Sequence, residues 1–383
     1  MSGFLAPEDL GGLFLGRVWH SDAAGPSVVT LRNGHVVDIT ARAAPTIRDI
    51  FELDDPAGYV RSAEGRQIGP LTQLVAAPVG DLRTNHFLAP CDLQAIKACG
   101  VTFAQSMVER VIEEQAAGDP QSAEAIRARI GATMGDSLRD IRAGSAQAAR
   151  VKKALIEEGL WSQYLEVGIG PDAEVFSKAQ TLSSVGPNAE VGLHPMSSWN
   201  NPEPEIVLAV SSAGRIVGAT LGNDVNLRDV EGRSALLLSK AKDNNASCAI
   251  GPMIRLFDDS FTLTDVKQAE LDLTVTGEDG FVMTGHSSMK HISRSPEELV
   301  RQTIGRHHQY PDGLMLFLGT LFAPTQDRDT PGQGFTHKLG DVVSISCSGL
   351  GTLTNTVRLS TECAPWTFGV SHLMRNLATR NLI

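Results

Sequence analysis

The sequence predicts an α+β fold that is mainly β, and three patterns agree on it. Residues 165–360 contain many short apolar runs separated by turn signals rich in Gly, Pro and Asn. Residues 205–210 alternate between two faces at period two, as strands do. The regular strand–helix alternation of a doubly wound parallel sheet is missing. We therefore expect an all-β, rolled or barrel-like sheet in this region, with helices at its margins.

The strongest functional signal is a predicted hairpin with acidic residues. Glu203 and Glu205 lie two positions apart on a strand, so their side chains share one face. A reversal at residues 211–214 returns the chain, which places Gly222 opposite Glu203 and Asp224 one diagonal step beyond. Three converging carboxylates repel one another unless a cation joins them, and an oxygen ligand set favours Mg²⁺, Mn²⁺ or Ca²⁺. The alternative is a solvated acidic edge.

A break in the sequence pattern near residue 90 predicts two domains. We expect a small β-rich N-terminal domain over residues 1–90 and a catalytic domain over residues 91–383, with a helical insertion at about 103–160. In the first domain, Asn33-Gly34 predicts a two-residue hairpin turn, because both positions need positive φ. Thr46 is the predicted N-cap of a short helix that follows.

Further elements are predicted in the second domain. Residues 271–276 alternate and precede a turn, which predicts another hairpin. Ser295 begins a helix with the capping-box arrangement. Residues 314–318 read as a short buried strand, and residues 342–347 and 353–359 as two more.

Composition limits the partners and the compartment. The chain has 44 acidic and 33 basic residues, a formal net charge of −11 and no basic stripe, so we expect no nucleic-acid partner. Its five cysteines form no C-x-x-C pair, which favours free thiols in a reducing compartment. The sequence shows neither a secretory leader nor an apolar run of about 18 residues, so we expect a cytoplasmic protein without a membrane partner.

The remaining chemistry concerns a lysine near the predicted ion. The sequence lacks the nucleophile-elbow, P-loop, dinucleotide-binding and H-E-x-x-H motifs, so those enzyme classes have no support. By default Lys242 is solvated; near a divalent ion and partly desolvated, its pKa falls and it can accept a proton. Glu174 is either exposed or a further carboxylate of the cluster.

A set of motifs over about residues 90–360 resembles the fumarylacetoacetate hydrolase superfamily in content and order. The motifs are Pro202-Glu-Pro-Glu205, Gly222-Asn-Asp-Val-Asn-Leu-Arg-Asp229, Lys242, Gly251-Pro252, Gly319-Thr320, Leu339-Gly-Asp341 and Gly349-Leu-Gly-Thr-Leu-Thr-Asn355. The resemblance implies a mixed β-sandwich roll with a small N-terminal domain, and it makes a homo-oligomer, a dimer or tetramer, the expected assembly.

The resemblance also implies roles for individual residues. A divalent ion would be held by four carboxylates, those of Glu174, Glu203, Glu205 and Asp224. Lys242 matches the active-site lysine of the superfamily. Thr320 matches the threonine that helps to hold the substrate, and we predict Arg228 and Ser106 as further substrate contacts.

One departure from the superfamily pattern bears on the reaction. Members that hydrolyse carbon–carbon bonds resemble G-x-N-Y-x-x-H-x-x-E, in which the histidine activates water; here Ser106 stands at that position. An unassisted serine hydroxyl is a poor base at neutral pH. The alternative is that His86 or His194 does this work. Glu231 is a second departure, since some hydrolases have an amide there.

These features are similar to those of the 2-keto-3-deoxy-pentonate dehydratase branch, as are Ala89-Pro-Cys-Asp-Leu-Gln-Ala-Ile-Lys97 and Gly285-His-Ser-Ser-Met289. The implied enzyme is a Mg²⁺-dependent hydro-lyase that converts a 2-oxo acid substrate to 2,5-dioxopentanoate, with Lys242 moving the C3 proton and Glu174 taking part in catalysis. One alternative is a hydrolase of acylpyruvates or 2,4-diketo acids. Another is a metabolite-binding protein without catalysis.

Overall fold

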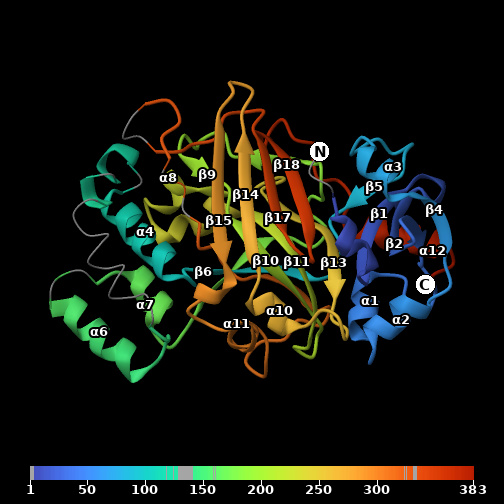
Figure 1. Cartoon of the computed structure of the whole chain (residues 1–383), viewed down its shortest axis with the longest axis horizontal. Coiled ribbons are helices and arrows are strands. Elements are labelled where there is room, and N and C mark those ends of the chain that lie inside the picture. The colour runs from blue at the N-terminus through green and yellow to red at the C-terminus, as the bar shows by residue number, and fades with distance from the viewer. Residues whose placement is uncertain are drawn as a thin grey trace.

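A computed structural model describes residues 4–117, 119–123, 125–127, 141–157, 159, 161–322, 324, 326–330 and 334–383. Two β-sheets form its centre, and the five-stranded sheet lies across the face of a larger one (Figure 1). Helices gather mainly at the two ends and below the sheets (Figure 1). The predicted mainly β, α+β class is confirmed.

The larger sheet has eleven strands within the described residues. Their order is β4-β3-β2-β1-β13-β11-β10-β16-β6-β7, and β5 pairs with β1. Only β16 and β6 are parallel among these described pairs. The bounds are β1 Phe14–His20, β2 Gly25–Arg32, β3 His35–Asp38, β4 Arg66–Pro70, β5 His86–Leu88, β6 Ala95–Gly100, β7 Glu174–Ala179, β10 Pro204–Val210, β11 Ile216–Asp224, β13 Cys248–Leu256 and β16 Leu314–Phe317.

The smaller sheet confirms the strands predicted in the last third of the chain. Its order is β15-β14-β17-β18-β8, and a separate two-stranded sheet joins β9 to β12. The bounds are β8 Glu190–Leu193, β9 Asn200–Asn201, β12 Asn226–Leu227, β14 Glu270–Thr276, β15 Val282–Ser288, β17 Val342–Cys347 and β18 Gly351–Leu359.

The helices lie around these sheets. Ser295 caps α11, as predicted, because its side chain accepts a hydrogen bond from the backbone N–H of Glu298. The bounds are α1 Ile47–Glu52, α2 Pro56–Ser62, α3 Leu71–Ala76, α4 Ala104–Gln115, α6 Ala146–Glu157, α7 Gln163–Ile169, α8 Arg228–Glu231, α9 Leu238–Lys242, α10 Leu263–Lys267, α11 Pro296–Thr303 and α12 Val370–Thr379.

The predicted helical insertion is present in part. Helices α4 and α6 lie within it, and with α7 they form the left end of the molecule (Figure 1). The prediction of helix through 119–160 is wrong at residues 141–145, which form a turn that ends in a bend before α6. Gly144 has a φ of 70° there, a conformation that glycine adopts readily. The part of the prediction at 128–140 lies outside the described residues.

The N-terminal segment forms the elements predicted for it. Asn33 and Gly34 have φ values of 51° and 74° and join β2 to β3, as the hairpin turn requires. Thr46 caps α1 through a capping box with Asp49. Strand β1 pairs with β13, so the large sheet continues from this segment into the rest of the chain. The domain boundary near residue 90 stays a prediction.

Strand β10 lies between two hydrophobic clusters. Ile206 and Leu208 pack in the cluster between the two sheets, whereas Val207 and Ala209 face a second cluster that includes residues of α1. The predicted alternation is therefore present, but the prediction of a half-buried strand is wrong. Every residue of β10 is buried, because the strand is central in its sheet and covered on both faces.

Two compositional predictions can be compared with the structure. All five cysteines are free and buried, as expected: Cys91, Cys99, Cys248, Cys347 and Cys363. Among the described residues, no helix has the length and apolar character needed to cross a membrane.

Candidate metal and substrate site

The β10–β11 hairpin brings the three predicted carboxylates together. Its register differs from the prediction: Gly222 lies opposite Glu205, and Asp224 lies opposite Glu203, donating its N–H to the Glu203 carbonyl at 3.0 Å. The predicted pairing of Gly222 with Glu203 is wrong by two positions. The connection is one residue longer than assumed, and the pairing shifts again between Ala209 and Val210, a β-bulge.

Glu203, Glu205 and Asp224 form a buried carboxylate triad. Each offers an oxygen, and these oxygens all lie within 4.8 Å of one another. Glu205 Oε2 also accepts the backbone N–H of Gly319 at 2.6 Å. Gly319 has a φ of 88°, and a Cβ there would lie 2.1 Å from the Thr102 hydroxyl, so the position requires glycine.

Two buried lysines bind carboxylates of the triad. Lys242, at the end of α9, lies with Nζ 2.5 Å from Glu203 Oε2 and 3.1 Å from Asp224 Oδ2. Lys178, on β7, lies 2.8 Å from Asp224 Oδ1 and donates to the backbone carbonyls of Val225 and Lys242 at 3.1 and 2.6 Å. Both lysines are buried, and Lys178 has no exposed surface. We call the triad with these two lysines the strand wall.

Glu174 lines the same pocket from the start of β7. In the described residues, the carboxylate oxygens that all lie within 4.8 Å of one another belong to the three triad residues, and Glu174 is not one of these. Its side chain packs against Gly100 on the neighbouring strand, where a Cβ would lie 2.0 Å from Glu174 Oε2. The missing side chain of Gly100 therefore makes room for this carboxylate.

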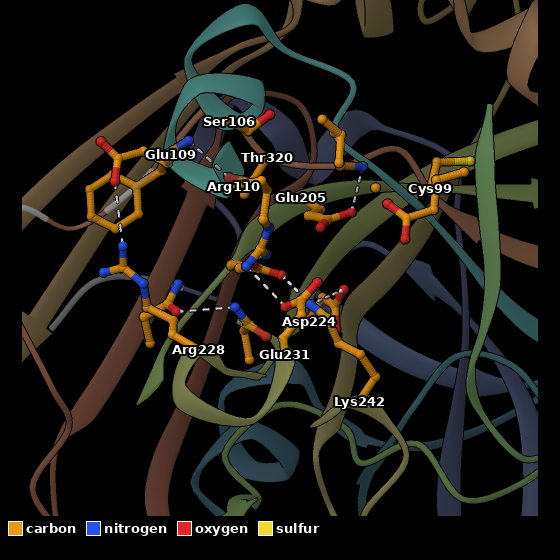
Figure 2. Close-up of a pocket in the computed structure, with 18 of the residues that line it drawn as sticks. Cys99, Ser106, Glu109, Arg110, Glu205, Asp224, Arg228, Glu231, Lys242 and Thr320 are labelled. Carbon is orange, nitrogen blue, oxygen red and sulfur yellow. Dashed lines mark hydrogen bonds and ion pairs between the residues drawn. The ribbon is translucent and has the colours of Figure 1, made fainter. Parts of the chain in front are cut away.

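The opposite side of the pocket is built on α4 and α8. Arg110 Nη2 lies 2.7 Å from Glu203 Oε1, and Nη1 lies 2.6 Å from Glu113 and 2.9 Å from Glu231. Figure 2 shows Arg110 reaching down from α4 while Lys242 comes up from below. We call this side, formed by Arg110, Glu113 and Glu231 with the neighbouring Glu109 and Arg228, the helix wall.

Arg228 is held within the helix wall. Its Nε donates to Glu113 at 2.6 Å, and Nη1 donates to the carbonyl of Pro324 at 3.3 Å. Its guanidinium also stacks over the Trp199 ring at 4.2 Å. Arg228 lines the pocket, as its predicted role in substrate binding requires, but its donors are already engaged.

Ser106 and Thr320, the other two predicted substrate contacts, line the pocket as well (Figure 2). Ser106 Oγ accepts the backbone N–H of Phe103 at 3.3 Å, which caps the start of α4, and donates to the Phe103 carbonyl at 2.8 Å. Thr320 Oγ1 accepts the backbone N–H of Phe322 at 3.1 Å. Their roles toward a substrate stay predictions.

No histidine is among the described residues that line this pocket. His86 lines a different hollow, where it accepts the N–H of Gly80, and His194 accepts the N–H of Met196 at 3.1 Å. The alternative that one of these two histidines activates water here therefore finds no geometric support in the described part of the chain.

The surroundings shift the pKa of the acidic groups in opposite directions. Burial raises the pKa of Glu174 to about 7, and Glu231 acts in the same sense. Burial and then Asp224 raise the pKa of Glu205 well above its ordinary value. The pKa of Asp224 is lowered instead, because Lys178 and Lys242 outweigh the effect of burial.

The protein's own groups raise the pKa of Lys242. Burial lowers its pKa, but Asp224 and Glu203 outweigh this effect and raise the pKa above the ordinary lysine value. The expected fall therefore does not arise from the protein's own groups. These two carboxylates are also the ones that a metal ion would engage.

The described residues of the site fit a divalent cation. The donors are hard oxygens, which Mg²⁺ prefers. At full ionisation, five carboxylates face three cationic side chains, which leaves two excess negative charges; they are Glu174, Glu203, Glu205, Asp224 and Glu231 against Lys178, Lys242 and Arg110. Adding Arg228 with its partner Glu113 leaves this balance unchanged.

Comparison with known proteins identifies the family. Residues 170–358 match the family model described as "Fumarylacetoacetate (FAA) hydrolase C-terminal". A Haloferax volcanii protein named "Probable 2-keto-3-deoxyxylonate dehydratase" is 32% identical over 326 residues, which cover 85% of this chain and 93% of that protein. The chain belongs to the fumarylacetoacetate hydrolase family. The expected family is thus confirmed.

One further relative of this fumarylacetoacetate hydrolase family member is a dehydratase by name, and dehydratases are hydro-lyases. The 2-dehydro-3-deoxy-D-arabinonate dehydratase of Saccharolobus solfataricus is 30% identical over 185 residues, which cover 48% of this chain and 58% of that protein. The solved structure of 2-keto-3-deoxy-D-arabinonate dehydratase with magnesium and 2,5-dioxopentanoate has a TM-score of 0.62 at 21% identity, covering 90% and 99% of the two chains. At this identity the likeness concerns the fold.

Two basic side chains that bind the triad were not predicted from the sequence. Lys178 lies four positions after Glu174 on the same strand, so the period-two pattern places both side chains on one face. This spacing could have predicted that Lys178 belongs to the site. Arg110 gave no such signal, because it is one of several charged residues on α4. Only the packing of α4 against the hairpin brings its guanidinium to Glu203.

Proposed function

We propose that this protein is a Mg²⁺-dependent dehydratase that converts a 2-keto-3-deoxy-pentonate to 2,5-dioxopentanoate and water. The observation that carries the proposal is the buried carboxylate triad, with a lysine on two of its members and Glu174 on the wall of the same pocket. The dehydratase names of the relatives agree with it. Mn²⁺ and Ca²⁺ are possible substitutes for the ion, since they prefer similar ligands.

The residues that would hold the ion are Glu203, Glu205 and Asp224, with Glu174 as a fourth carboxylate at the edge of the set. When bound, the ion supplies a Lewis acid that withdraws electrons from the 2-oxo and carboxylate oxygens of the substrate and so acidifies C3. Gly319 fixes Glu205 through its N–H, and Lys178 fixes Asp224. These contacts orient the ligands before substrate arrives.

Proton transfer is assigned to two side chains of the site. Lys242 Nζ would take the C3 proton. Asp224 and Glu203 raise the pKa of Lys242, and binding of the ion to these two carboxylates would remove that rise. Glu174 lies at the edge of the ligand set; while it does not bind the ion it has a pKa of about 7, and it would then give a proton to the departing C4 hydroxyl. Overall the substrate loses its C3 proton and its C4 hydroxyl, which make up one water once the proton on Lys242 has replaced the one that Glu174 gave. Tautomerisation of the resulting 5-hydroxy enone gives the C5 aldehyde.

The test is incubation with 2-keto-3-deoxy-pentonate and, separately, with an acylpyruvate. We expect a semialdehyde of unchanged chain length from the first and no pyruvate from the second. Activity should disappear with a chelator and return with Mg²⁺. Release of pyruvate from the acylpyruvate would instead make the protein a carbon–carbon hydrolase, and lack of any turnover would leave a binding protein. The proposed assembly is a homo-oligomer, which sedimentation would test.

A further inference from the structure

Arg110 binds one member of the triad, Glu203, although no sequence pattern pointed to it. Its Nη2 binds Glu203 Oε1 at 2.7 Å, while Lys242 binds the other oxygen of Glu203 at 2.5 Å. Both oxygens of this proposed ligand are therefore engaged by cations. A divalent ion that uses Glu203 adds further positive charge beside these two cations, and in a buried site this repulsion favours the release of one of them.

The contacts indicate which cation moves. Lys178 and Lys242 are buried, and Lys178 is fixed by two backbone carbonyls. The side chain of Arg110 is 13% exposed and lies on the pocket wall. It also keeps two other carboxylates, Glu113 and Glu231, so it can leave Glu203 without losing all compensation of its charge.

A released Arg110 would keep Nη1 on Glu113 and Glu231 and turn Nη2 toward the pocket. A guanidinium held in this way suits a carboxylate, which it binds with short, charge-assisted hydrogen bonds. Arg228 is less suited, since Glu113, Trp199 and the Pro324 carbonyl already hold it. The ligand implied is the carboxylate of the 2-oxo acid.

We propose that Arg110 leaves Glu203 when the divalent ion binds and then binds the substrate carboxylate, which couples ion loading to 2-oxo acid binding. The inference rests on the proposed function. It gives the helix wall a role in specificity that the triad alone does not supply. By linkage, the coupling is reciprocal: the 2-oxo acid strengthens ion binding by the same factor as the ion strengthens 2-oxo acid binding.

The experiment measures binding without turnover. Calorimetry on the metal-free protein gives the Mg²⁺ affinity, and calorimetry on the Mg²⁺-loaded protein gives the affinity for pyruvate, which has the 2-oxo acid group but no C4 hydroxyl. In Arg110→Met we expect Mg²⁺ affinity to rise and pyruvate affinity to fall, each by about tenfold, within the usual range of such couplings. A merely structural residue would weaken both.

Two further variants sharpen the result. Arg110→Lys keeps the charge but loses the planar fork, so we expect Mg²⁺ affinity near that of the wild type and weaker pyruvate binding. Arg358→Met is the matched control: Arg358 pairs with Glu190 at 3.3 Å on an exposed face of β18 and should change neither affinity. Circular dichroism of each variant establishes that it is folded.

Weaker Mg²⁺ binding, or unchanged pyruvate binding, in folded Arg110→Met would overturn the inference and leave the proposed function in place. If Arg110→Met does not fold, Arg110→Lys decides, and wild-type pyruvate affinity in that variant is the contrary result. Failure of the wild-type protein to bind Mg²⁺ would contradict the proposed function itself, and the inference with it.

Discussion

The two walls of the pocket hold their charges in different ways. On the strand wall, buried lysines bind Glu203 and Asp224, and backbone groups fix Lys178 and Glu205. On the helix wall, Arg110 shares its donors among carboxylates from three elements and remains partly exposed. The first arrangement suits an ion that requires fixed geometry. The second suits a group that changes partners during binding.

The largest expected effect is on the strand wall. Glu203→Gln keeps the size of the side chain but removes a proposed ligand charge, so turnover of 2-keto-3-deoxy-pentonate should fall by more than about a hundredfold. The fold should remain, as measured by circular dichroism. Near wild-type turnover in a folded Glu203→Gln protein would contradict the ligand assignment.

Gly100→Ala tests the edge of the strand wall. The new Cβ would lie 2.0 Å from Glu174 Oε2, so the flexible carboxylate must move. Because displacement of a catalytic group by about 1 Å can cost about a hundredfold, we expect kcat to fall by roughly that factor while KM changes little. Gly369→Ala, which meets no atom within 4 Å, is the control and should behave as wild type. An unchanged kcat would remove Glu174 from the proposed mechanism.

Lys178→Met tests how firmly the strand wall must be fixed. The variant loses the contact of 2.8 Å to Asp224 and two hydrogen bonds to backbone carbonyls. We expect Mg²⁺ affinity to fall by about 10- to 100-fold in calorimetry, the usual effect of removing a partner of a metal ligand. Lys97→Met, on the neighbouring β6, is the matched control. Equal Mg²⁺ affinity in both variants would show that Asp224 needs no such support.

The smallest expected effect concerns pH. The pKa of Glu174 is about 7 against an ordinary 4.5, so its stabilising contribution to the metal-free protein is present below about pH 4.5 and is lost as pH rises through about 7. The raised pKa of Glu205 has the same sign. Mg²⁺ competes with these protons, so the Mg²⁺-induced rise in Tm should be larger at about pH 8 than at about pH 5. Thermal unfolding at both pH values measures this, and a larger rise at pH 5 would oppose it.

The sequence predicted the strand wall better than the helix wall, and the reason is the range of the interactions. Glu203, Glu205 and Asp224 belong to one hairpin, whose period-two pattern already implies a shared face. The register of that hairpin was wrong by two positions, because neither the longer connection nor the bulge leaves a clear signal in the sequence. The triad still converges in the structure, since a shift by two keeps every side chain on its face.

By itself the sequence determined the mainly β class, the hairpin of carboxylates and Lys242 as a candidate, because these depend on local periodicity and on residue types in fixed order. Only the tertiary structure decided that Arg110, from a helix distant in sequence, binds Glu203, and that burial raises the pKa of Glu174 while lysines lower that of Asp224. Charges act through space and through the medium around them, and neither can be read from neighbours along the chain.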